Sequence, residues 1–81
     1  MTYVYMLQSI SHPEQRYTGL TTDLDKRLAA HNAGQSSHTA KYCPWKLVGY
    51  LAFFDKDKAL DFEKYLKSGS GRAFAEKRLW P

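Results

Sequence analysis

Cysteine is almost absent from this chain, because Cys43 is the only one among its 81 residues. An internal disulfide is therefore excluded. The histidines are scattered along the chain, at His12, His31 and His38. Together with Cys43 they lack the close spacing of the nitrogen and sulfur ligands of a structural zinc site. We expect one domain over residues 1–81 with a limited core, stabilised by packing or by self-association.

Long apolar runs are also absent. No window approaches the roughly 20 apolar residues of a membrane-spanning helix. The N-terminus has no basic segment followed by an apolar run, so we expect no signal peptide, no membrane partner and a cytoplasmic location. Lys and Arg outnumber Asp and Glu by 12 to 8, a net charge of +4. This balance favours an acidic partner such as nucleic acid, although many small basic proteins bind none.

Apolar, aromatic and β-branched residues predict three strands, over residues 2–8, 16–21 and 45–54. The short polar connection between the first two favours an antiparallel hairpin. Neighbouring strands lie about 4.8 Å apart, so Tyr5 and Tyr17 could share one face of this hairpin. Gly19, inside the second strand, is typical of a bulge or a close backbone approach.

Three helices are predicted between and after these strands. The first has Thr22 or Asp23 as its N-cap and ends at about Asn32, the second spans 56–68 after Asp55, and a short third spans 72–79. The "SGSG" sequence is expected to stop the second helix, and the segment 35–44 is polar and irregular. The resulting order, β-β-α-β-α-α, predicts an α+β fold in which helices flank a small three-stranded antiparallel sheet.

The first helix carries polar residues where apolar ones are expected. Leu24 and Leu28 define its buried stripe; His31 falls between them on the helical wheel, and Arg27 sits beside the stripe. Each has an ordinary structural explanation. Arg27 could extend its charged end to solvent from the edge of the core, and His31 could be a core histidine bonded to backbone.

The second predicted helix repeats this feature with Glu63, which lies next to its apolar stripe. The ordinary explanation is an ion pair with Lys67, four residues on. The functional explanation is a carboxylate that faces a site near the sheet. Two phenols, a guanidinium, an imidazole and a carboxylate together suit phosphoryl chemistry, since Arg grips phosphate, a carboxylate holds a divalent metal, and a phenol can relay a proton.

The ordered set of these residues resembles the GIY-YIG nucleases, in particular small stand-alone members similar to the nuclease module of bacterial excision-repair endonucleases. "YVY" at residues 3–5 and "YTG" at residues 17–19 stand where the two family motifs lie. "TTDLDKRLAAHNAG" resembles the family's catalytic helix and "ALDFEKYLKSGSGR" its metal-binding helix. The likeness covers roughly residues 2–72.

The resemblance implies a metal-dependent DNA endonuclease that hydrolyses phosphodiester bonds in branched or damaged DNA with one divalent metal, Mg²⁺ or Mn²⁺. Tyr17 would act as general base on the attacking water, and Tyr5 would position that water or the phosphate. Arg27 would stabilise charge on the phosphate, and His31 would support the phosphate or assist proton transfer. Glu63 would hold the metal.

The chain departs from the family pattern in three places, and two other functions stay open. Tyr3 replaces a glycine, Thr18 replaces an aliphatic residue, and Leu20 stands where the excision-repair members carry a lysine. The first alternative is a nucleic-acid-binding module of the same fold, with little or no catalysis, that acts through a partner protein. The other is a small structural domain. Because 81 residues leave no room for a separate DNA-binding domain, we expect a partner protein to supply target choice.

Overall fold

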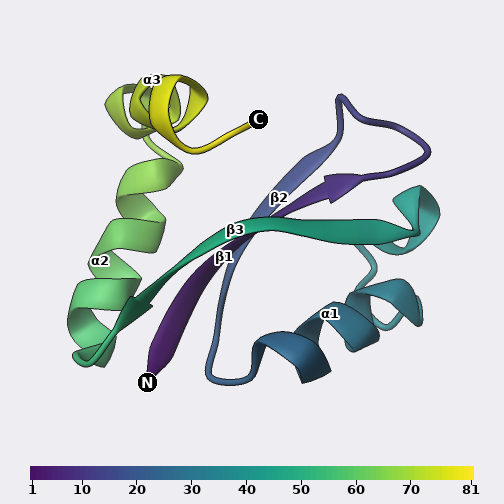
Figure 1. Ribbon diagram of the computed structural model, residues 1–81, viewed down its shortest axis with the longest axis horizontal. Coiled ribbons are helices and arrows are strands. Elements are labelled where there is room, and N and C mark those ends of the chain that lie inside the picture. Colours follow the sequence, from purple (N-terminus) through teal and green to yellow (C-terminus); the bar gives the residue numbers. More distant parts are fainter.

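A three-stranded antiparallel sheet forms the centre of the protein, which a computed structural model describes from Met1 to Pro81 (Figure 1). Its strands are β1 (Thr2–Ser9), β2 (Arg16–Thr21) and β3 (Trp45–Phe53). The order across the sheet is β2-β1-β3, so the N-terminal strand is central. The three predicted strands and their antiparallel hairpin are confirmed, with boundaries within one residue.

The strand register places the two motifs side by side. Tyr5 on β1 is paired with Gly19 on β2, and Leu7 is paired with Tyr17. Because side chains alternate along a strand, Tyr5, Leu7 and Tyr17 lie on one face of the sheet. Val4 lies on the other face, and β1 is buried on both sides.

Helices cover the two faces of this sheet from opposite sides (Figure 1). Helix α1 (Leu24–Asn32) lies on one side, and α2 (Lys56–Leu66) and α3 (Gly69–Arg78) lie on the other. Asp23 and Asp55 cap α1 and α2, each accepting a hydrogen bond from a backbone N–H of the first turn. A short 3-10 helix, Ala40–Tyr42, lies within the segment expected to be irregular.

The third helix differs from the sequence prediction. Helix α2 ends at Leu66, and α3 begins at Gly69, three residues before the predicted start at 72. The "SGSG" sequence both ends one helix and begins the next, because Ser68 Oγ accepts a hydrogen bond from the backbone N–H of Gly71. A Cβ at Gly71 would overlap the carbonyl of Tyr65, so only glycine lets α3 start this close to α2.

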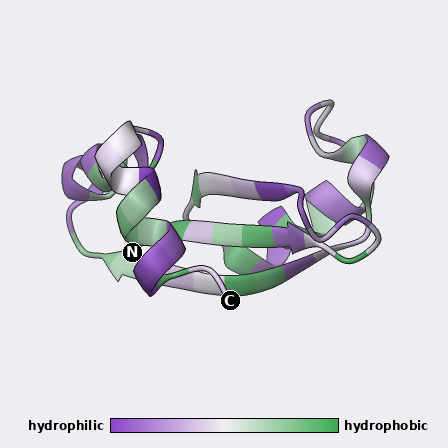
Figure 2. Ribbon diagram, turned by 90° about the horizontal axis from the view of Figure 1, so that it is seen from above, coloured by the Kyte–Doolittle hydropathy of each residue, from purple (hydrophilic) through white to green (hydrophobic).

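Two small apolar clusters fill the spaces between the sheet and the helices. On the α2 and α3 side, Val4 packs with Ala59, Leu66 and Ala75. On the α1 side, Tyr5, Leu7 and Trp45 form the second cluster. Hydrophobic stretches run along the strands, whereas the helices alternate between hydrophobic and hydrophilic residues (Figure 2). None of the helices has both the length and the apolar composition needed to cross a bilayer.

Candidate active site

The hydroxyl of Tyr5 is the centre of a buried polar cluster. It lies 2.9 Å from Nε2 of His31, and it accepts a hydrogen bond from Nε of Arg27 at 3.2 Å. Tyr5 is 2 % exposed. An added Cβ at Gly19 would lie 2.5 Å from this hydroxyl. Because Gly19, the glycine of the second motif, has no side chain, it leaves room for the Tyr5 hydroxyl.

His31 is held on both ring nitrogens. Its Nε2 bonds Tyr5, and its Nδ1 lies 2.8 Å from Oγ1 of Thr39, just before the 3-10 helix. The ring is 1 % exposed. Burial, and then the charge of Arg27, lowers the pKa of His31, so the neutral imidazole is favoured. The prediction that His31 lies on the buried stripe is confirmed, but its partners are side chains rather than backbone.

Tyr17 completes the cluster from the edge strand β2. Its ring centroid lies 4.9 Å from that of His31 and 6.1 Å from that of Tyr5. Tyr17 is only partly buried, unlike the other two rings. The expectation that Tyr5 and Tyr17 share one face of the hairpin is confirmed, and Tyr17 is the more accessible of the two phenols.

Burial and hydrogen bonding shift the pKa values of Tyr5 and Arg27 in this cluster. Burial raises the pKa of the Tyr5 hydroxyl, although the hydrogen bond from Arg27 works against this effect. The bond to Tyr5 is also the main reason that the pKa of Arg27 is raised, and Tyr17 contributes in the same direction. At neutral pH the site therefore holds a protonated Tyr5 and a cationic, solvent-exposed Arg27. Such a guanidinium can grip a phosphate.

Glu63 forms no hydrogen bond or ion pair with these four side chains. It projects from α2, on the other side of the sheet from α1, and forms an ion pair with Lys67 at 2.6 Å. The ordinary i,i+4 pairing expected from the sequence is confirmed. No group of three His, Cys, Asp or Glu side chains is placed to enclose a metal. A single carboxylate nevertheless fits Mg²⁺, which keeps several waters and often takes its remaining ligands from substrate phosphates.

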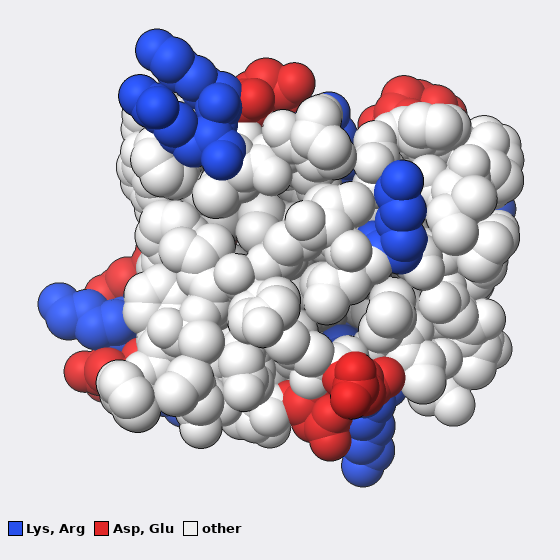
Figure 3. All heavy atoms as spheres, in the orientation of Figure 1, with Lys and Arg blue, Asp and Glu red and all other residues white.

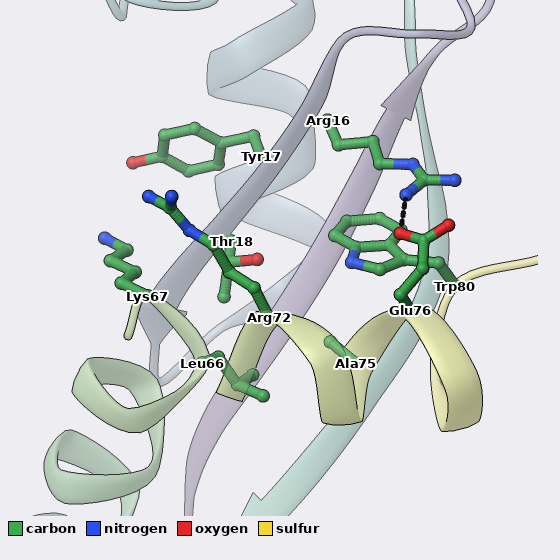
Figure 4. Close-up of a pocket in the computed structure, with 9 residues that line it drawn as sticks. All are labelled: Arg16, Tyr17, Thr18, Leu66, Lys67, Arg72, Ala75, Glu76 and Trp80. Atoms are coloured by element: carbon green, nitrogen blue, oxygen red, sulfur yellow. Dashed lines mark hydrogen bonds and ion pairs between the residues drawn. The ribbon is translucent and has the colours of Figure 1, made fainter. Parts of the chain in front are cut away.

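A pocket of about 480 Å³ lies beside Tyr17. Its walls come from β2, the end of α2, α3 and the C-terminal segment (Figure 4). Tyr17 and Lys67 both line it, and Lys67 is the partner of Glu63. Arg27 lines a separate recess of about 450 Å³ on the α1 side. The polar cluster therefore borders two open spaces at this edge of the sheet.

Sequence analysis missed several side chains of this region, among them Thr39, Lys67 as a pocket residue, and Arg72. Thr39 lies in a segment without periodicity, so nothing in the sequence pairs it with His31. Arg72 reaches the pocket only because α3 packs closely on α2 at Gly71. The positions of Thr39 and Arg72 depend on contacts between distant segments, so no local sequence pattern predicts them.

The family model for the GIY-YIG catalytic domain matches residues 1–77 of this chain. The chain belongs to the GIY-YIG family. Similar proteins include UPF0213 protein SpyM3_1077 of Streptococcus pyogenes serotype M3, 39% identical over 72 residues, which cover 88% of this chain and 76% of the relative. UPF0213 protein SpyM50708 of serotype M5 has the same identity and coverage.

A solved structure extends this likeness to three dimensions. The solution NMR structure of UPF0213 protein BH0048 from Bacillus halodurans is 32% identical, with a TM-score of 0.55. The match covers 95% of this chain and 84% of that one. GIY-YIG domains form a nuclease superfamily whose members generally use divalent metal ions, which supports a nuclease-type function in general for this chain.

Proposed function

We propose that this GIY-YIG domain, residues 1–81, is a metal-dependent DNA endonuclease that hydrolyses phosphodiester bonds. The proposal rests mainly on the hydrogen bonds around the Tyr5 hydroxyl. Arg27 and His31 both bond this atom, and Tyr17 packs against the same rings. An exposed guanidinium beside an accessible phenol suits attack of water on a phosphate.

The proposed reaction assigns different work to each side chain. Water attacks the phosphorus and passes a proton to the Tyr17 oxygen, which releases its own proton to solvent in the same step, and the bond from phosphorus to the leaving oxygen breaks. Solvent protonates the leaving oxygen. Arg27 contacts the phosphate and stabilises its developing charge. Tyr5 contributes by holding Arg27 in place, since its own hydroxyl is buried.

His31 acts as a positioning residue in this proposal. Both of its nitrogens are occupied within the protein, so its effect reaches the substrate through Tyr5. Glu63 would hold the divalent metal, Mg²⁺ or Mn²⁺, once Lys67 moves from it. The metal, when bound, supplies positive charge that polarises the phosphate. We further propose a cytoplasmic role on branched or damaged DNA, with a partner protein for target choice.

The basic surface supports a weak, general attraction to DNA. Lys and Arg side chains gather over α3 at the upper left of Figure 3, while most of that face is uncharged. With a net charge of +4, the domain makes few phosphate contacts, so its affinity for DNA should be weak and depend modestly on salt.

The test is a cleavage assay on duplex, nicked and branched DNA with Mg²⁺ or Mn²⁺, and with chelator as the blank. We expect cleavage that needs the metal, and its loss in Glu63→Gln. Asp61→Asn is the matched control, because it removes one exposed carboxylate from the same helix. Circular dichroism checks the fold of both variants. Equal cleavage by both would remove Glu63 from the reaction.

A nucleic-acid-binding module is the second candidate function. The observation in its favour is the ion pair of Glu63 with Lys67, because a carboxylate already neutralised is a poorer metal ligand. This function predicts DNA binding without cleavage by the wild type on every substrate and with either metal.

A further inference from the structure

The pocket beside Tyr17 has an uneven distribution of charge. Three cations line it against a single carboxylate, Glu76. Glu76 is already paired with Arg16 at 2.6 Å. Only two ion pairs form in the whole chain, and neither includes Arg72. Arg72 is thus a pocket cation without a carboxylate partner. Lys67 is a second pocket cation, and its partner Glu63 does not line the pocket.

These two cations lie at the same end of the pocket as the proposed general base. The hydroxyl of Tyr17, the guanidinium of Arg72 and the ammonium of Lys67 gather on one side of β2 (Figure 4). A phosphate bound by Arg72 and Lys67 would therefore lie next to the scissile phosphate, the one attacked by the water beside Tyr17. Arginine suits this contact because its planar fork of donors matches phosphate oxygens.

The opposite end of the pocket is aromatic. Trp80 lines it, and the guanidinium of Arg16 lies 4.9 Å from the centroid of the Trp80 ring. Glu76 fixes Arg16 in that position through their ion pair. The guanidinium therefore covers one face of the indole, and a base can stack on that face only by taking its place. An aromatic ring next to basic side chains is the arrangement that proteins use to bind nucleobases together with the backbone phosphates.

We propose that this pocket binds one unpaired nucleotide of the DNA strand next to the phosphate that is cleaved. Arg72 and Lys67 contact its phosphate, and Trp80 stacks on its base. Stacking on Trp80 needs a free base face, which neighbouring bases cover in a duplex. The inference rests on the proposed function and specifies its substrate: DNA with an unpaired segment, such as a flap or single strand, is bound better than continuous duplex.

Binding can be measured apart from cleavage, in chelator, so that failure of the two proposals is distinguishable. The chain has two tryptophans. Trp45 is 4 % exposed and its indole donates to the carbonyl of Thr39, so Trp80 is the responsive fluorophore. We expect a short single-stranded oligo-thymidylate to quench this fluorescence, and a blunt duplex of equal length to bind several-fold more weakly.

Variants of α3 provide the matched comparison. Arg72→Gln should weaken oligo-thymidylate binding by about tenfold and lower the slope of log K against log salt by about 0.7, one phosphate contact on a single strand. Arg78→Gln removes the same charge from an exposed position on the same helix, outside the pocket, and should bind like the wild type. Trp80→Phe should remove most of the quenching.

Three results would overturn the proposal. One is equal binding of oligo-thymidylate by Arg72→Gln and Arg78→Gln. This result would count whether or not Trp80→Phe folds. Another is equal affinity for duplex and single strand. The third is quenching by inorganic phosphate at the same affinity, which would make the pocket an anion site without base recognition. Binding that behaves as expected in a protein that never cleaves DNA would overturn the proposed function alone.

Discussion

The Tyr5 hydroxyl and Nε2 of His31 are 2.9 Å apart, and this contact joins the central strand to helix α1. Neither atom is accessible to water, since both residues are almost fully buried. The site is therefore part of the core on the α1 side. Changes to it should alter stability as well as function.

Tyr5→Phe should lower the free energy of unfolding by about 1–3 kcal/mol, because it leaves Nε2 of His31 buried without a partner. Urea denaturation measures this loss. Tyr50→Phe is the control, since Tyr50 is 53% exposed and forms no hydrogen bond through its hydroxyl. A Tyr5→Phe protein as stable as Tyr50→Phe would show that the contact contributes nothing.

Gly19→Ala should destabilise the fold by about 1–3 kcal/mol through overpacking. Its Cβ would lie 2.5 Å from the Tyr5 hydroxyl and 2.9 Å from the ring of Tyr17. Gly69→Ala, where nothing lies within 4 Å of the new Cβ, should be neutral or slightly stabilising. Thermal unfolding of the two variants separates a demand for space at Gly19 from a general cost of replacing glycine. Equal melting temperatures would contradict the packing described for Tyr5.

His31 should make stability depend on pH. Its pKa is lowered in the folded protein, so the unfolded chain binds the proton more tightly. Its contribution to stability is therefore present above its ordinary pKa of 6.5 and lost as the pH falls from there toward the folded pKa. Unfolding free energies from about pH 8 to about pH 5 test this. The decrease should be smaller in His31→Gln and unchanged in the exposed His38→Gln.

Thr39→Val should reduce kcat more than it changes KM, because Thr39 is buried and its hydroxyl bonds Nδ1 of His31. The loss of its hydroxyl should also cost about 1–3 kcal/mol of stability. Thr39→Ser keeps the hydroxyl and should restore both. A valine variant with wild-type kcat would show that the orientation of His31 does not matter for turnover.

Most of the fold could be predicted from the sequence because its signals are local. Strand β2 follows from a short run that contains aromatic and β-branched residues, and Asp23 and Asp55 mark the starts of their helices as caps. The start of α3 could not be predicted, because the need for glycine at Gly71 comes from the carbonyl of Tyr65 in another helix. His31 was predictable from its place on the buried stripe.

The remainder of the site depends on contacts between distant segments. Arg16, Arg72 and Trp80 meet only when β2, α3 and the C-terminal segment pack together. The sequence also places Glu63 and Lys67 as a pair, but it does not show that Lys67 reaches the pocket that Tyr17 lines.

The most direct test of the proposed nuclease is the single-turnover cleavage rate of Tyr17→Phe at saturating metal. The variant keeps the ring that packs on His31 and loses only the hydroxyl. Tyr3→Phe, on the same face of the neighbouring strand, is the control and should cleave at the wild-type rate. We predict that Tyr17→Phe binds DNA normally and cleaves it about 10² to 10⁴ times more slowly. An unchanged cleavage rate in Tyr17→Phe would contradict the account.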